Sequence, residues 1–171
     1  MRTSVLFCWL VFLAGVLLSY HYYPLLPESV PSHFGSEGKA DGWMEKDAFL
    51  TFMGILGVSI LGLFLVLARL LRHIPNSLIN LPHRDYWLAP ERRTETLERI
   101  GDMLAWFGVA TLCFFLAILK MSFDAALMED PRLDEGIMTA LLVGYLGYTA
   151  LWVVRLYARF RKPAPGLEGS A

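Results

Sequence analysis

The sequence predicts an all-α membrane protein, a four-transmembrane-helix bundle with both termini in the cytoplasm. Of its 171 residues 56% are hydrophobic, the mean hydropathy is +0.47 and only 18% are charged, a smaller charged fraction than soluble domains carry. Four apolar stretches are long enough to cross a bilayer, and the basic residues are distributed unequally among the segments that connect them. At this length the chain has room for one compact bundle with short loops.

Each predicted crossing meets the requirement of about 20 predominantly apolar residues, which follows from a rise of ~1.5 Å per residue. The four run from Ser4 to Tyr22, from Ala48 to Leu71, from Met103 to Met121 and from Gly136 to Tyr157, with no charged side chain near any centre. The first is longer than the core of a secretory signal and has no A-x-A pattern at its end, so we interpret it as an uncleaved anchor.

The basic residues predict the orientation. Eleven lie at the N-terminus, in or beside the segment between the second and third crossings, or near the C-terminus, whereas the other four lie in or beside the two remaining loops. Because positively charged loops resist translocation, the larger set is expected in the cytoplasm. The loops at residues 23–47 and 122–135 are then expected outside.

The crossings also divide the chain into segments. Residues 1–71 are expected to form a two-helix domain with an ordered outer loop, and residues 72–102 a cytoplasmic loop with a short helix. That helix begins at Pro90, a favoured first position, and runs into the third crossing. Residues 103–157 hold the third and fourth crossings, and residues 158–171 form a cytoplasmic tail expected to be disordered.

A stripe of small residues marks the fourth crossing. Gly136, Ala140 and Gly144 repeat at four-residue spacing, which lets another helix approach closely. The stripe is interpreted first as a packing surface within the bundle. The alternative is that it forms the contact of a homo-oligomer.

The outer loop between the first two crossings is the most distinctive stretch. It contains three prolines that discourage helix and three glycines that permit positive φ, so an ordered turn structure is expected. Candidate ligand-binding residues in it are His33, Phe34, Asp41, Trp43 and Lys46. Asp41 can orient the His33 imidazole while Lys46 supplies positive charge near the head groups. Alternatively, Asp41 forms an Asx-turn, His33 bonds within its own loop and Lys46 reaches the membrane interface.

The motif of this loop runs Tyr-Pro-x-Leu-Pro, Pro-x-His-Phe, Gly and Asp-Gly-Trp, followed by Lys. It comprises Tyr23, Pro24, Leu26, Pro27, Pro31, His33, Phe34, Gly38, Asp41, Gly42, Trp43 and Lys46. The motif resembles the domain of unknown function at the N-terminal end of SdpI-type immunity and signalling proteins. The resemblance implies a multi-pass protein of the bacterial cytoplasmic membrane. SdpI-type proteins bind an exported toxin peptide and hold a repressor at the membrane, but they carry more helices after this domain than the two expected here.

The cytoplasmic loop contains an aromatic pair among arginines. The candidate partner-binding residues are Arg84, Asp85, Tyr86, Trp87, Arg92 and Arg93. Arginine with aromatic side chains is good chemistry for docking a cytoplasmic protein. In the alternative interpretation the aromatic rings lie in the inner membrane interface and the arginines meet anionic head groups.

Several function classes are disfavoured. The net charge of −1 argues against nucleic-acid binding, and Cys8 and Cys113 lie in apolar runs, so neither a metal site nor a cofactor is expected. Coupled transport normally needs ionisable groups at membrane depth, and these crossings have none near their centres. We expect a non-enzymatic sensor, accessory or immunity-like protein that recognises an exported peptide or envelope component. The alternatives are a structural subunit of a membrane complex and an enzyme acting on a lipid-linked substrate through His33 with Asp41, or His83 with Asp85.

Overall fold

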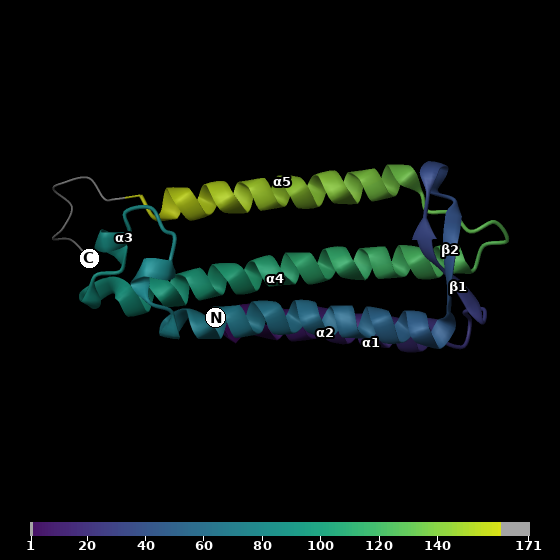
Figure 1. Cartoon of the computed structure of the whole chain (residues 1–171), viewed down its shortest axis with the longest axis horizontal. Coiled ribbons are helices and arrows are strands. Elements are labelled where there is room, and N and C mark those ends of the chain that lie inside the picture. The colour runs from purple at the N-terminus through teal and green to yellow at the C-terminus, as the bar shows by residue number, and fades with distance from the viewer. Residues whose placement is uncertain (1, 162–171) are drawn as a thin grey trace.

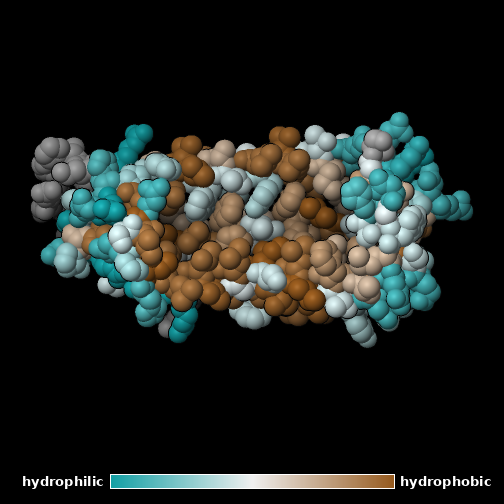
Figure 2. Space-filling view, in the orientation of Figure 1, coloured by the Kyte–Doolittle hydropathy of each residue, from teal (hydrophilic) through white to brown (hydrophobic). Residues whose placement is uncertain are grey.

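Four long helices form the body of the protein in the computed structural model, which describes residues 2–161 (Figure 1). They are α1 (Arg2–Tyr22), α2 (Lys46–Leu70), α4 (Pro90–Ala126) and α5 (Glu135–Arg159). Each is long and apolar enough to cross a membrane. The surface shows an apolar band between two polar ends (Figure 2), as a bilayer requires. We call these ends the hairpin end and the cap end after the structures that close them.

Helix α4 is the centre of the bundle, with α1 and α2 packed against it. Leu61 of α2, Leu112 of α4 and Cys8 of α1 form one buried cluster between the three helices. Where α2 meets α4, the Phe64 ring lies against Gly108, and a Cβ at Gly108 would stand 2.7 Å from the Phe64 Cγ. The absence of a side chain at Gly108 therefore sets the distance between these two helices.

Helix α5 is attached to α4 by aromatic side chains and contains no buried residue. The hydroxyls of Tyr145 and Thr111 are 2.9 Å apart, and the Trp152 indole N–H donates to the Met103 carbonyl at 3.1 Å. Phe114 stacks on Tyr145 with ring centroids 4.6 Å apart. Most of the surface of α5 is thus left without a partner inside the described chain.

The expectation that the helix from Pro90 runs straight into the third crossing is confirmed. It forms one helix of 37 residues that continues to Ala126, beyond the predicted end at Met121. Its last turns carry Phe123 and Ala126 into a buried cluster at the hairpin end. This packing extends the helix and shortens the connection to α5.

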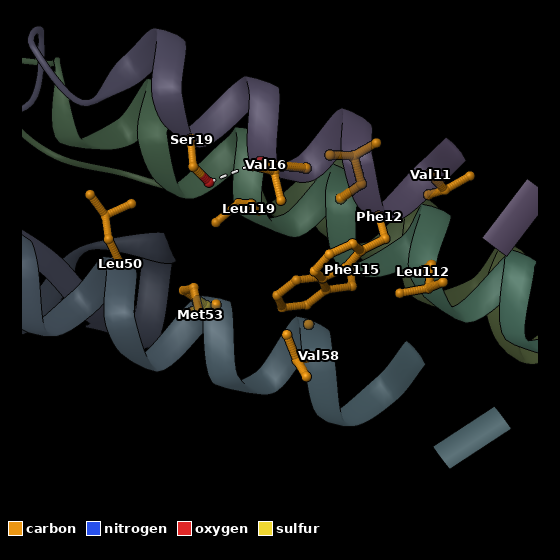
Figure 3. A pocket seen from close by; sticks show the side chains of 14 residues that line it. Val11, Phe12, Val16, Ser19, Leu50, Met53, Val58, Leu112, Phe115 and Leu119 are labelled. Atoms are coloured by element: carbon orange, nitrogen blue, oxygen red, sulfur yellow. Dashed lines mark hydrogen bonds between the residues drawn. The ribbon is translucent and has the colours of Figure 1, made fainter. Parts of the chain in front are cut away.

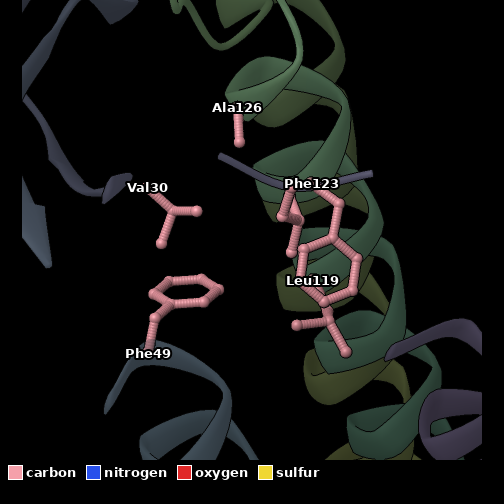
Figure 4. Packing of buried hydrophobic residues seen from close by; sticks show 6 residues of the cluster. Val30, Phe49, Leu119, Phe123 and Ala126 are labelled. Atoms are coloured by element: carbon pink, nitrogen blue, oxygen red, sulfur yellow. The ribbon is translucent and has the colours of Figure 1, made fainter. Parts of the chain in front are cut away.

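The loop between α1 and α2 is a β-hairpin, which corrects the prediction of an all-α fold. Strands β1 (Ser29–Phe34) and β2 (Ala40–Glu45) pair antiparallel across a short 3₁₀ turn, η1 (Ser36–Gly38). A two-stranded hairpin is marginal by itself and needs packing. Val30, 1% exposed, supplies it by facing the rings of Phe49 and Phe123 (Figure 4).

A packed cap closes the opposite end. It comprises η2 (Leu71–His73), η3 (Asn76–Leu78) and α3 (Arg84–Trp87), whose apolar side chains cover the start of α4. Phe160 follows α5, is 1% exposed and accepts a hydrogen bond on its carbonyl from the Trp87 indole at 2.7 Å. Ordered structure therefore continues to Phe160, inside the predicted tail, while residues 162–171 of that tail lie outside the described residues.

Gly108→Ala tests the close approach of α2 and α4. The added methyl would overlap Phe64, and overpacking of this kind costs about 1–3 kcal/mol, more than the ~1 kcal/mol that Ala gains over Gly in a helix. We expect a lower melting temperature in detergent, followed by tryptophan fluorescence. Gly147→Ala is the matched control, because a Cβ there meets no atom within 4 Å. Equal melting temperatures for the two variants would contradict the packing described.

Candidate functional site

His33 and Asp41 form a pair across the hairpin. The imidazole Nδ1 lies 2.5 Å from the Asp41 Oδ1, and the two side chains are 73% and 53% exposed. His33 pairs with Gly42 in the strand register, which shifts on both sides of His33. Such irregularities re-aim a side chain out of the normal alternation. The predicted approach of Asp41 to the His33 ring is thus present in the structure.

Two glycines of the hairpin region make room for this pair. A Cβ at Gly42 would stand 2.8 Å from the Cβ of His33, and a Cβ at Gly35 would overlap the Asp41 carboxylate. Neither distance is tolerated by real side chains. Gly35 and Gly42 are therefore required by the His33–Asp41 contact itself.

The pair leaves one imidazole nitrogen for another molecule. With Nδ1 protonated and donating to Asp41, Nε2 is an acceptor held in a defined orientation. Among residues 2–161, no group of three or more His, Cys, Asp or Glu side chains could hold a metal ion. The pair is chemically suited to hydrogen bonding with a ligand.

The other predicted residues of this loop separate into two groups. Trp43 is 52% exposed and lies two residues from Asp41 on β2, and Phe34 is half-buried. Lys46 is different. Its Nζ lies 3.4 Å from the Glu28 carboxylate and 4.9 Å from the centre of the Tyr23 ring, and its side chain is only 13% exposed. Lys46 therefore belongs to the boundary between α1 and α2.

The loop between α4 and α5 binds the tip of the hairpin, a contact that the sequence did not reveal. The Ala40 N–H donates to the Pro131 carbonyl at 3.1 Å, and the Leu133 N–H donates to the Gly38 carbonyl at 2.9 Å. Gly38 has a φ of +68°, and a Cβ there would overlap the Leu133 carbonyl. The only sequence signal was Gly38 itself, whose conformational freedom is needed here. The hairpin is thus held from below by Val30 and from the side by this loop.

Comparison with known families places the hairpin in a defined segment. Residues 10–57 match the domain of unknown function DUF1648. This domain is found in SdpI-type membrane proteins, as the loop motif predicted. The match covers most of α1, the whole hairpin and the first half of α2. No curated protein and no solved structure matches the chain.

The candidate residues of the cap lie outside the DUF1648 segment, and most are engaged in internal contacts. The Arg93 guanidinium donates to the Asn76 side chain and to the carbonyls of Arg72 and Ile74. The Arg92 guanidinium lies 3.9 Å from the centre of the Tyr86 ring and donates to the Tyr86 carbonyl. These contacts hold the cap together.

Trp87 also has a role inside the cap. Its ring meets Phe160 edge to face, with centroids 5.4 Å apart, and its carbonyl accepts from the Thr96 hydroxyl at 2.9 Å. Arg84 and Asp85 remain exposed and lie 3.5 Å from one another. Of the six predicted residues, these two are the ones that the structure leaves on the outer surface of the cap.

Gly38→Ala is expected to release the α4–α5 loop from the hairpin. Ala is disfavoured by about 1–2 kcal/mol at positive φ and would in addition overlap the Leu133 carbonyl. Cleavage after Glu129 by a glutamate-specific protease should accelerate by at least about fivefold, the factor that 1 kcal/mol represents. Ser32→Ala, an exposed change on the same hairpin, should leave the rate unchanged. Equal rates for the two variants would disprove a stabilising role of this contact.

Proposed function

We propose that this protein is a non-enzymatic sensor or accessory protein of the bacterial cytoplasmic membrane, whose hairpin recognises an exported peptide or another envelope component. The observation that carries the proposal is the way the hairpin is built. The hairpin is anchored by the buried Val30, while Trp43 and the His33–Asp41 pair are exposed on it. Rigid presentation lowers the entropic cost of binding.

The chemistry of the hairpin end suggests the kind of ligand. Exposed acidic side chains occur on the hairpin, at the starts of α2 and α5 and in the loop between α4 and α5; they are Glu28, Glu37, Asp41, Glu45, Asp47, Glu129, Asp130, Asp134 and Glu135. A surface of this charge attracts basic groups, and an exposed tryptophan is a frequent centre of binding energy. A ligand with basic and apolar groups, such as a cationic peptide, fits this surface best.

The orientation that we propose places the hairpin outside the cell and the cap in the cytoplasm. It is supported by the excess of Arg and Lys at the cap end, because positively charged segments are retained in the cytoplasm. The internal contacts of Arg92, Arg93 and Trp87 make the cap a rigid closure. We therefore assign recognition to the hairpin and leave Arg84 and Asp85 as the contact for a cytoplasmic protein.

The alternative candidate is a structural subunit of a membrane complex or a homo-oligomer. The stripe of Gly136, Ala140 and Gly144 is exposed, and a Cβ at Gly144 meets no atom within 4 Å. Ala140 and Gly144 line a shallow pocket together with Ala110 and Phe114 of α4, so the stripe borders α4 but the space over it is not filled by the bundle. A helix of another chain, including a second copy, would fit against it.

Cysteine labelling in intact cells tests the orientation. A membrane-impermeant maleimide should label Ser32→Cys on the hairpin in intact cells, and Ser77→Cys in the cap only after permeabilisation. Both serines are exposed. The unchanged chain gives the background, since Cys8 is buried and Cys113 lies within the apolar part of α4. The reverse pattern would show that the hairpin faces the cytoplasm.

Photocrosslinking in cells tests the recognition itself. A benzophenone residue at Trp43 is expected to capture one envelope peptide or protein, identified by mass spectrometry, and the double variant His33→Ala/Asp41→Asn should reduce the yield at least about tenfold, as loss of a binding hot spot does. Ser32→Ala, an exposed change on β1, is the control. Capture of lipid alone would disprove the proposal, and capture of a second copy alone would favour the structural subunit.

A further inference from the structure

An apolar groove lies between α1 and α2, in the half of the bundle nearest the hairpin. Its floor is formed by α4, where Phe115 projects between the two helices (Figure 3). The groove has a volume of about 290 Å³. Its lining residues on α1 and α2 run from Val11 to Val58, and all of these except Val58 lie in the segment that matches DUF1648.

Glycines open this groove. A Cβ at Gly54 would meet no atom within 4 Å, and a Cβ at Gly15 would meet only a Leu116 methyl at 3.8 Å. Because Gly15 and Gly54 have no side chains, space the size of a side chain is left between α1 and α2 at these positions. Space of this kind at membrane depth is filled by an apolar chain, because unfilled space forfeits dispersion contacts.

The lining selects an apolar occupant. Of the 14 lining residues, Ser19 alone has a polar side chain, and its hydroxyl donates to the Gly15 carbonyl of its own helix at 2.9 Å. The groove thus presents no unpaired hydrogen-bonding side chain to an occupant. A hydrocarbon chain satisfies it fully, whereas a polar group would lose its hydrogen bonds there.

A positive charge stands at the mouth of the groove. Lys46 precedes the lining residue Leu50 by one turn of α2, and Tyr23 follows the lining residue Ser19 by one turn past the end of α1. The Lys46 Nζ lies 4.9 Å from the centre of the Tyr23 ring, so the two side chains meet one helical turn beyond the lining residues on the hairpin side. Glu28, its partner in an ion pair, is 91% exposed, whereas the Lys46 side chain is 13% exposed, so another anion would reach the ammonium by replacing the Glu28 carboxylate.

We propose that the groove binds an acyl chain of an anionic phospholipid and that Lys46 binds the phosphate of the same molecule. In a phospholipid the negatively charged phosphate lies next to the start of the acyl chains. In the protein the Lys46 ammonium lies next to one end of the apolar groove, so the phosphate and an acyl chain can bind at the same time. Leu50 and Met53 line the groove and also pack against the buried cluster under the hairpin. The bound acyl chain would therefore pack against residues that support the buried cluster under the hairpin.

Native mass spectrometry of the delipidated protein in detergent tests the proposal. Phosphatidylglycerol should bind more tightly than phosphatidylcholine with the same acyl chains. Gly54→Leu fills the groove and should weaken phosphatidylglycerol binding by at least about tenfold, since every buried methylene contributes. Gly62→Leu is the matched control, because its Cβ also meets no atom within 4 Å and Gly62 does not line the groove.

The charge is tested separately. Lys46→Gln should weaken phosphatidylglycerol binding about fivefold, the contribution of one lysine near an anionic surface, and Lys39→Gln at the hairpin tip should not. If Gly54→Leu proves misfolded by circular dichroism, Gly54→Ala should give a smaller loss in the same direction.

Three results would overturn the proposal: equal binding by the Gly54→Leu and Gly62→Leu variants, equal binding of the two lipids, or loss of a dimer in Gly54→Leu with lipid binding unchanged. The last would identify a second copy as the occupant. The assay uses purified protein and depends neither on the ligand of the hairpin nor on orientation. Its failure is therefore distinguishable from failure of the proposed function.

Discussion

The contact between Val30 and the rings of Phe49 and Phe123 is the interaction on which the hairpin end depends. It joins strand β1 to the start of α2 and to the last turns of α4. Full burial of a valine contributes about 1.5 kcal/mol, enough to matter for a two-stranded hairpin that is marginal alone. With the hairpin seated, its other face is presented in one defined position.

A polar cluster at the same level ties α1 to α4. The Tyr22 hydroxyl donates to Asp124 at 2.5 Å, and the Lys120 ammonium donates to the other oxygen of that carboxylate at 2.5 Å. The Tyr22 ring stacks on Phe123, one of the two rings that contact Val30. Tyr22 therefore takes part both in the hydrogen bond to Asp124 and in the packing under the hairpin. Charged groups at this depth are stable because each has a partner and because the boundary of the apolar band lies close by.

The cap end is built by the same principle with different side chains. Arg93 satisfies three backbone or amide oxygens in the irregular segment after α2, and Trp87 joins α3 to the residue that follows α5. An arginine fork can satisfy several acceptors at once, which is why it suits a segment with little regular hydrogen bonding. Arg93 and Trp87, which the sequence suggested as partner-binding residues, therefore stabilise the cap through internal contacts.

The sequence by itself determined the four apolar helices, the helix start at Pro90 and the DUF1648 motif, because each depends on composition or on spacing along the chain. It also predicted that Asp41 would meet His33, since the two lie close in sequence within one short loop. Lys46 was predicted to supply positive charge near the head groups or to reach the membrane interface, and the structure adds that its side chain meets Tyr23 and Glu28.

Only the tertiary structure decided that the loop is a hairpin, that α4 extends to Ala126 and that the α4–α5 loop binds Gly38. Each of these rests on contacts between residues far apart in the chain, such as Val30 with Phe123 and Gly38 with Leu133. Prolines and glycines indicate turns locally, and strand pairing wins here because burial and hydrogen bonding from other segments outweigh that local preference.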